Sequence, residues 1–459
     1  MPVRELSNDI REAVVRETFQ RLRNWLYPTP HDPTTALVLS GGGARSAFQA
    51  GVLRYIAEAF PDAEFPVLTG VSAGAINTAH LANDSNAFPE AAGRLVESWR
   101  MLEPENVVAA SSSLSLLWGL LWRNGFADAS DGTENPGTHD VRRTHGLLDT
   151  TPLWTFLNRR LGAANGTLTG VEDNLRSGHL QAVAVITTNY ATGQTVTWVQ
   201  GDDFDVWEAP DRVSVHSRLT VDHIMASTAL PLVFPAVRIG DAWYGDGGIR
   251  LTAPLAPAVH LGADRVLAIS NRYPRTRAEA DEPSVTGYPP TAQIIGIVMN
   301  AIFGDALAQD AHTLARVNAL VKELPKSKRH GMRPVDLFQI RPSVDLGRLA
   351  VDYQDRLPAA FRFLTTGLGT DETQSSDWLS VLLFDPDYID RLLDIGYHDA
   401  RRQHDELAEF LRGGAVDRGL HPPPRTPRQE ETSEPVSSSS PDGVPSPAAD
   451  DALTSSGAS

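Results

Sequence analysis

The apolar positions of this chain change their spacing in a regular order from residue 34 onward. Residues 36–39 form a short apolar run, and apolar side chains then recur at helical spacing over residues 47–60. Residues 67–71 and 73–81 repeat this order of strand and helix. Such alternation is typical of parallel strands joined by right-handed crossovers. The pattern therefore predicts an α/β fold with a mainly parallel central sheet.

Further elements follow the same logic. Residues 271–415 have mostly helical spacing of their apolar positions. Residues 1–27 carry one apolar stripe. That stripe predicts a helix that either packs on the main domain or lies on a membrane surface. Thr192 and Gly193 predict a turn between two strands. The remaining strand candidates are residues 180–188, 194–199, 265–270 and 334–347.

These patterns divide the chain into four predicted parts. Residues 421–459 contain 8 Pro and 9 Ser with hardly an apolar side chain, so they cannot bury enough surface to offset the entropy of ordering. We expect them to form a disordered tail. The other parts are an N-terminal helix with a linker (1–33), the main α/β domain (34–270), and a mostly helical C-terminal portion packed on it (271–420).

Composition narrows the classes of function. The chain has 459 residues, of which 41% are hydrophobic, so it can build a large core. Its net charge of −17 argues against nucleic-acid binding, because that affinity comes from basic groups. The absence of cysteine removes disulfides and thiolate metal sites. Its first residues lack the apolar core of a signal peptide, and no run of about 18 apolar residues occurs, so we expect a cytoplasmic protein without a transmembrane helix.

Three consecutive glycines, Gly41 to Gly43, stand between the first predicted strand and helix. Because glycine has no Cβ, the amides of such a loop can approach a ligand beside the positive end of the helix dipole. The loop is therefore expected to face a group that is, or becomes, negative. The alternatives are a plain tight turn and a dinucleotide site. Against the latter, Ser46 occupies the third glycine position of G-x-G-x-x-G, and the second strand runs into Ser72 instead of an acidic residue.

A second motif, G-x-S-x-G, spans Gly70, Ser72 and Gly74 between the second strand and its helix. The two glycines permit a sharp turn that exposes the serine Oγ at the carboxyl edge of the sheet, which is the position of a nucleophile. Adjacent parallel strands would bring the glycine loop beside Ser72. Its amides could there donate to the oxyanion of a tetrahedral intermediate.

Asp246 is the candidate base for this serine. Gly247 and Gly248 follow it, and such glycines let a carboxylate approach another backbone closely. By itself, an Asp-Gly-Gly stretch is usually only a turn. An unperturbed aspartate is also a weak base toward a hydroxyl, because its pKa is about 3.9.

Histidines offer two alternatives. His260 would complete a conventional triad in the chain order of the α/β-hydrolases, but it lies in an apparent helix. His223 is expected to be structural. His398 and His404 are six residues apart and do not share a helical face, so we expect no metal site there and assign them to a solvated helix.

Taken together, these stretches resemble a known family. SGGGARS (40–46), GVSAG (70–74) and DGG (246–248), with ASTALPLVFPAV (226–237) before the last, are similar to the patatin-like phospholipases over roughly residues 34–270. The resemblance implies a three-layer α/β/α fold with a catalytic domain at 34–270. It also implies a lipid acyl hydrolase, similar to a phospholipase A, that cleaves ester bonds through an acyl-serine intermediate.

The resemblance further implies a Ser-Asp dyad without a cofactor or metal. The implied roles are nucleophile and base for Ser72 and Asp246, and oxyanion donors for Gly41, Gly42, Gly43 and Ala44. Ser40 and Ser46 depart from the family pattern, which commonly has Asp and Gly there. Arg45 is retained, and we expect it to steady the loop or an anionic head group. The alternatives are a transacylase that uses the same dyad and a non-catalytic lipid- or nucleotide-binding module.

Two apolar runs, residues 114–126 and 294–303, are candidates for membrane contact. Each predicts either a buried core helix or an interfacial lid. Because the chain is acidic, we expect any docking to rest on apolar and aromatic contacts and not on attraction to anionic lipid. The expected partners are a lipid or phospholipid substrate and a membrane surface, with no nucleic acid. The sequence carries no prediction of an oligomeric state.

Overall fold

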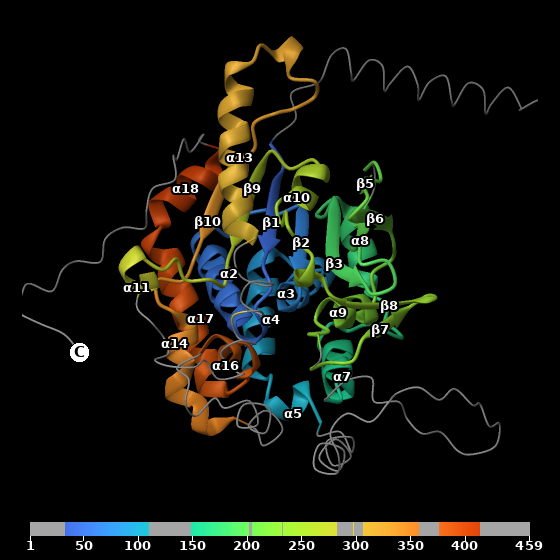
Figure 1. Ribbon diagram of the computed structural model, residues 1–459, viewed down its shortest axis with the longest axis vertical. Helices are drawn as coiled ribbons and strands as arrows, with labels where there is room; N and C mark the ends of the chain where they lie inside the picture. The colour runs from blue at the N-terminus through green and yellow to red at the C-terminus, as the bar shows by residue number, and fades with distance from the viewer. Residues whose placement is uncertain are drawn as a thin grey trace, which may run out of the picture. The chain divides into compact units, whose positions relative to one another are not determined.

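A ten-stranded sheet forms the centre of the computed structural model (Figure 1). Its strand order is β10-β9-β1-β2-β3-β4-β6-β5, and β8 pairs with both β3 and β7. The strands are β1 (Thr35–Leu39), β2 (Val67–Val71), β3 (Ala182–Asn189), β4 (Thr195–Gly201), β5 (Glu208–Ala209), β6 (Arg212–His216), β7 (Val237–Ile239), β8 (Ala242–Asp246), β9 (Arg265–Ile269) and β10 (Asp336–Ile340). The structure describes residues 33–109, 148–201, 204–231, 233–281, 297, 306–357 and 376–413.

The strands from β10 to β3 are parallel, so their carboxyl ends lie at one edge of the sheet. Every residue of β1, β2 and β9 is buried, as expected for strands covered on both faces. At β3 the sheet becomes mixed, because β4 and β8 both pair with it in the antiparallel direction. The predicted α/β fold with a mainly parallel sheet is thus confirmed, and strands β5 to β8 are additions that the apolar pattern did not predict.

Helices cover both faces of this sheet (Figure 1). The α-helices are α2 (Ala47–Ala59), α3 (Ala73–Asn83), α4 (Phe88–Arg100), α5 (Pro104–Val107), α7 (Thr151–Arg160), α8 (Thr169–Ser177), α9 (Val221–Ser227), α10 (Ala256–His260), α11 (Arg277–Asp281), α13 (Ala306–Glu323), α14 (Leu346–Ala350), α16 (Ser376–Leu382), α17 (Pro386–Arg402) and α18 (His404–Arg412). Short 3-10 helices are η1 (Gly43–Ser46), η2 (Gly247–Ile249), η3 (Lys326–Lys328) and η4 (Val351–Arg356).

Alternate residues of β1 point into two separate apolar clusters. Leu37 and Leu39 pack in the larger cluster with side chains of α2, α3, α4 and α17. Ala36 and Val38 pack in the smaller cluster with side chains of α10 and α13. Since successive side chains of a strand point to opposite faces, the two clusters are the two interfaces of a three-layer α/β/α fold.

Helix α17 lies directly against α2. A Cβ added at Gly51 of α2 would be 2.0 Å from the carbonyl oxygen of Leu393, and one at Gly396 of α17 would be 2.0 Å from that of Phe48. Each helix therefore needs a glycine where the other helix backbone approaches it. This contact holds the C-terminal helices on the helix that follows the glycine loop.

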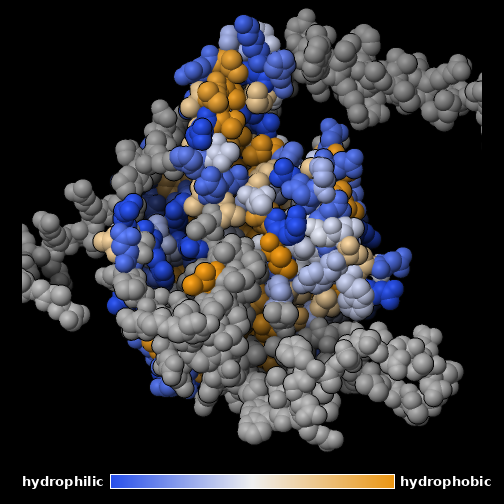
Figure 2. All heavy atoms as spheres, in the orientation of Figure 1, coloured by the Kyte–Doolittle hydropathy of each residue, from blue (hydrophilic) through white to orange (hydrophobic). Residues whose placement is uncertain are grey.

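No helix among residues 33–109, 148–201 and the other described ranges is long and apolar enough to cross a membrane. Apolar side chains are exposed along α13 (Figure 2), where Val317 and Leu320 are 40% and 64% exposed. The predicted helix at 1–27, the apolar run at 114–126 and the predicted tail lie outside the described residues, as does the run at 294–303 except for its residue 297.

Candidate active site

Ser72 stands in a sharp turn between β2 and α3. Its φ of 54° and ψ of −134° are rare for a residue with a side chain, and such conformations cost about 1–3 kcal/mol each. A Cβ at Gly70 would be 2.2 Å from Thr78 Oγ1, and one at Gly74 would be 2.3 Å from the carbonyl oxygen of Leu39. Both glycines are therefore required by close packing, and together they allow the turn that the motif predicted.

The glycine loop lies against this turn. Because β1 pairs with β2 in parallel, the residues that follow β1 lie beside Ser72. A Cβ at Gly41 would be only 2.9 Å from the Cβ of Ser72. Gly43 has a φ of +55° and begins η1. The amides of Gly43 and Ala44 are in the first turn of that helix, where backbone N–H groups have no intrahelical acceptor.

Asn271, just after β9, holds the glycine loop through hydrogen bonds. Its Nδ2 donates to the carbonyl oxygens of Ser40 (3.3 Å) and Gly41 (3.1 Å) and to the hydroxyl of Ser46 (2.9 Å), and its backbone N–H donates to Ser40 Oγ (3.2 Å). A Cβ at Gly42 would be 2.7 Å from the same Nδ2. Both serines that depart from the family pattern are thus anchored to one buried residue, Asn271, through its backbone N–H and its side-chain amide.

Other contacts fix the remaining sides of the loop. Gln49 of α2 donates to the carbonyl oxygen of Ser40 (2.8 Å), and Asn77 of α3 donates to Gln49 Oε1 (2.9 Å). Arg45 donates from Nε to the hydroxyl of Ser380 on α16 (2.6 Å). The loop is therefore held by side chains from three helices, and the position of Arg45 agrees with a role in steadying it.

Asp246 ends β8, which pairs with β3 so that Asp246 lies opposite Thr187. Its carboxyl is completely buried, and Oδ1 accepts a hydrogen bond from the Gly248 amide (2.8 Å). A Cβ at Gly247 would be 2.3 Å from the Ile186 carbonyl oxygen, so this glycine lets the turn close over β3. Burial raises the pKa of Asp246 from 3.8 to about 7, while the Ser72 hydroxyl and the Gly248 amide lower it.

The Ser72 hydroxyl and the Asp246 carboxyl are therefore neighbours, although they are 174 positions apart in the sequence. Oδ2 of Asp246 has no hydrogen-bond partner among the described residues. The contact with Ser72 is accordingly longer or more bent than a full hydrogen bond.

Two histidines considered from the sequence have other partners. His223 pairs through Nδ1 with the Thr220 hydroxyl (2.8 Å), and burial lowers its pKa to about 4. His260 stacks on Trp207, with ring centroids 4.7 Å apart. It precedes β9, at the amino edge of the sheet, whereas Ser72 follows β2 at the carboxyl edge. Within the described ranges, no histidine hydrogen-bonds to the serine or to the aspartate.

The C-terminal histidines are exposed, as predicted, on the successive helices α17 and α18, and each also contacts an aromatic ring. His404 Nδ1 lies 2.8 Å from the Tyr55 hydroxyl, and its ring stacks on Phe60 at 5.1 Å. His398 makes an edge contact with Tyr397 at 5.8 Å. In the part of the chain that the structure describes, no group of three or more His, Asp or Glu side chains could hold a metal ion.

One close neighbour of Ser72 was not found from the sequence. The backbone amide of Ser72 donates to the hydroxyl of Ser227 at the end of α9 (2.9 Å), and this hydroxyl donates to the carbonyl oxygen of Ile186 (2.6 Å). The two serines are 155 positions apart, so no local pattern could have paired them.

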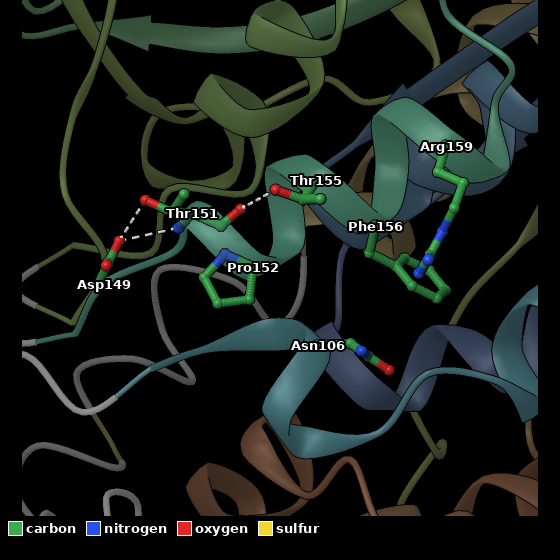
Figure 3. Close-up of a pocket in the computed structure, with 7 residues that line it drawn as sticks. All are labelled: Asn106, Asp149, Thr151, Pro152, Thr155, Phe156 and Arg159. Atoms are coloured by element: carbon green, nitrogen blue, oxygen red, sulfur yellow. Dashed lines mark hydrogen bonds between the residues drawn. The ribbon is translucent and has the colours of Figure 1, made fainter.

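A separate pocket of about 410 Å³ opens between α5 and α7 (Figure 3). Figure 3 shows Asp149 and Thr151 at one end and Phe156 and Arg159 at the other. Asp149 accepts hydrogen bonds from the Thr151 amide (2.9 Å) and hydroxyl (2.6 Å), so it caps α7. The lining residues, which include neither side chain of the dyad, are Asn106, Asp149, Thr151, Pro152, Thr155, Phe156 and Arg159.

Comparison with known proteins gives one family match. Residues 37–259 match the model of the patatin-like phospholipases. No curated protein matches the chain. Similar solved structures include VipD from Legionella pneumophila, with 13% identity and a TM-score of 0.33 over 82% of this chain and 68% of that one. Human GIVD cytosolic phospholipase A2 with methyl gamma-linolenyl fluorophosphonate has 12% identity and a TM-score of 0.40, over 85% of this chain and 62% of that one.

The matched range contains the glycine loop, the serine turn and Asp246, which are also the stretches that carry the resemblance in sequence. The sheet covered by helices on both faces is the fold that this family implies. The chain therefore contains a patatin-like phospholipase domain, at residues 37–259.

Proposed function

We propose that this protein hydrolyses acyl ester bonds of lipids with Ser72 as nucleophile and Asp246 as base. The main support is the environment of Asp246, a completely buried carboxyl beside the hydroxyl of a serine in a strained turn. Burial raises the pKa of this carboxyl to about 7. A general base with a pKa near the working pH is effective, whereas an ordinary aspartate is too weakly basic. Burial thereby removes the main chemical objection to the dyad.

In the first half of the reaction, Asp246 takes the proton of Ser72 Oγ while Oγ attacks the acyl carbon. The carbonyl oxygen becomes an oxyanion, and amides of the loop at Gly41–Ala44 donate hydrogen bonds to it. One such donor is worth about 3–4 kcal/mol in the transition state. The ester C–O bond then breaks, Asp246 returns the proton to the departing alcohol oxygen, and the acyl group remains on Ser72.

In the second half, water replaces the serine as nucleophile. Asp246 takes a proton from the water while the water oxygen attacks the acyl carbon. The same amides donate hydrogen bonds to the new oxyanion. The bond to Ser72 Oγ breaks, Oγ regains the proton, and a carboxylic acid leaves. The Asp246 carboxyl accepts a proton and then donates it in each half of the reaction. A pKa near neutrality favours both of these transfers.

Hydrolysis of a soluble short-chain ester and of phosphatidylcholine vesicles tests this proposal. Ser72→Ala and Asp246→Asn are expected to lose about a thousandfold or more in kcat/KM, as in other enzymes whose nucleophile or base is removed. His223→Ala and His260→Ala are the matched controls and should keep substantial turnover. Collapse of turnover in a correctly folded His260→Ala variant would contradict the dyad and favour a triad.

A further inference from the structure

A buried hydroxyl from a distant part of the chain holds the backbone of the proposed nucleophile. Ser227 is completely buried at the end of α9. Its Oγ accepts a hydrogen bond from the Ser72 amide at 2.9 Å and donates one to the Ile186 carbonyl oxygen at 2.6 Å. Both distances are those of full hydrogen bonds, so the single hydroxyl proton has a fixed direction and the Ser227 rotamer is defined from two sides.

The held amide belongs to the residue that has the strained conformation. Ser72 has a positive φ of 54°, which a residue with a side chain adopts only when its surroundings impose it. A hydrogen bond to the Ser72 N–H fixes the peptide plane that precedes its Cα. Together with the unusual φ of Ser72, the orientation of that plane sets the direction of the Cα–Cβ bond, and so the positions that Oγ can take relative to the Asp246 carboxyl.

The same segment holds the proposed base. Two residues after Ser227, the carbonyl oxygen of Ala229 accepts a hydrogen bond from the Asp246 amide at 3.0 Å. Ile186, the acceptor of the Ser227 proton, is next to Thr187, the register partner of Asp246. The end of α9 is therefore bonded to the backbones of both members of the dyad.

We propose that Ser227 is a positioning residue that directs Ser72 Oγ toward Asp246. The inference rests on the proposed function. Ser227 bonds to the backbone of the nucleophile and makes no hydrogen bond to Ser72 Oγ or to the Asp246 carboxyl among the described residues. It therefore acts on the rate of the acyl-transfer steps and not on the affinity for the lipid.

The test compares two variants that each delete one buried hydroxyl from adjacent residues. Ser227→Ala removes the contact with the Ser72 amide. Thr228→Val is the matched control, because Thr228 is 7% exposed and, among the described residues, its hydroxyl bonds only the helix carbonyls of Ile224 and Met225, both at 3.1 Å. Misplacing a reacting group by about 1 Å can cost a hundredfold in rate.

We expect Ser227→Ala to lower kcat for a soluble ester about 10- to 100-fold with KM changed less than about twofold, and to slow fluorophosphonate labelling of Ser72 by a similar factor. Thr228→Val should remain close to the unmodified protein in both assays. Ser227→Cys, which keeps a weak donor and acceptor at the same position, should give rates between those of Ser227→Ala and the unmodified protein. If Ser227→Ala fails to fold, the cysteine variant carries the comparison.

The pH profile separates positioning from general destabilisation. The Ser72 hydroxyl lowers the pKa of Asp246, so moving it away should raise the apparent pKa on the acid side of the kcat/KM profile. Loss of folded protein would reduce the amplitude and leave this pKa unchanged. The inference is overturned if the Ser227 variants keep the unmodified kcat and pH profile, or if Thr228→Val loses as much. Activity retained by Ser72→Ala would instead overturn the proposed function itself.

Discussion

Replacing Asp246 by asparagine should remove activity and, at neutral to alkaline pH, make the protein more stable. The carboxyl is completely buried, and its pKa is raised from 3.8 to about 7. Between these two values the folded protein holds a proton that the unfolded chain has released. Raising the pH through this window therefore favours unfolding, and the stability of the unmodified protein is highest below pH 3.8 as far as this group is concerned.

The size of the effect follows from the width of the window. One pKa unit corresponds to about 1.4 kcal/mol, so a gap of about three units amounts to about 4 kcal/mol once the pH exceeds 7. Of this window, the part from pH 5 to about pH 7 lies within the range from pH 5 to pH 8, which is about two pKa units. Since asparagine is neutral throughout, the stability advantage of Asp246→Asn over the unmodified protein should grow by roughly 2–3 kcal/mol across that range.

Urea unfolding at pH 5, 6, 7 and 8 measures this difference, because titration of all other groups is common to both proteins. Ser72→Ala is the control that keeps the carboxyl, so its stability should fall with pH at least as steeply as that of the unmodified protein. The changed hydrogen bonds at this position add a contribution to the difference in unfolding free energy that does not vary with pH. A total difference between Asp246→Asn and the unmodified protein that stays the same from pH 5 to pH 8 would refute the assignment of a raised pKa to Asp246.

Two further predictions concern rate and packing. The kcat/KM for ester hydrolysis should fall about tenfold from pH 8 to pH 6, because a base with a pKa of about 7 becomes protonated over this range; a profile that is flat down to pH 5 would contradict it. Gly74→Ala should cost about 3 kcal/mol in chemical denaturation, because its Cβ would be 2.3 Å from the Leu39 carbonyl oxygen. Gly93→Ala in α4 meets nothing within 4 Å and should instead stabilise by about 0.5–1 kcal/mol, and equal effects of the two would contradict the packing explanation.

The apolar periodicity predicted the parallel part of the sheet well. The runs at 36–39, 67–71 and 265–270 correspond to β1, β2 and β9 within one residue at each end. Continuous apolar runs are typical of strands buried on both faces, so the sequence of each of these strands was enough to predict it. Strand β8 could not, because its sequence AWYGD contains a glycine and an aspartate and depends on pairing with β3.

Some features of the candidate site could likewise be predicted from the sequence, and others could not. Parallel neighbours made the approach of the glycine loop to Ser72 predictable, because both follow strands that run in the same direction. The position of Asp246 depends on the antiparallel pairing of β8. The two glycines after it made it a candidate base, but such a stretch is usually only a turn, and the family resemblance added the implied role. Its raised pKa depends on complete burial, which no spacing of residues reveals. Ser227 and Asn271 act through hydrogen bonds to backbone atoms far away in the chain, so their residue types do not reveal these partners. Ser227 does lie in the stretch 226–237 that contributes to the family resemblance, but that resemblance assigned it no role.

Covalent labelling tests the Ser72–Asp246 dyad most directly. A fluorophosphonate probe bonds to a serine hydroxyl that a neighbouring base has activated, and peptide mass spectrometry then locates the label. We predict that the unmodified protein carries the label on Ser72, that Asp246→Asn reacts far more slowly, and that Ser72→Ala does not react. Labelling of Ser72→Ala at the rate of the unmodified protein would contradict the assignment of Ser72 as the nucleophile.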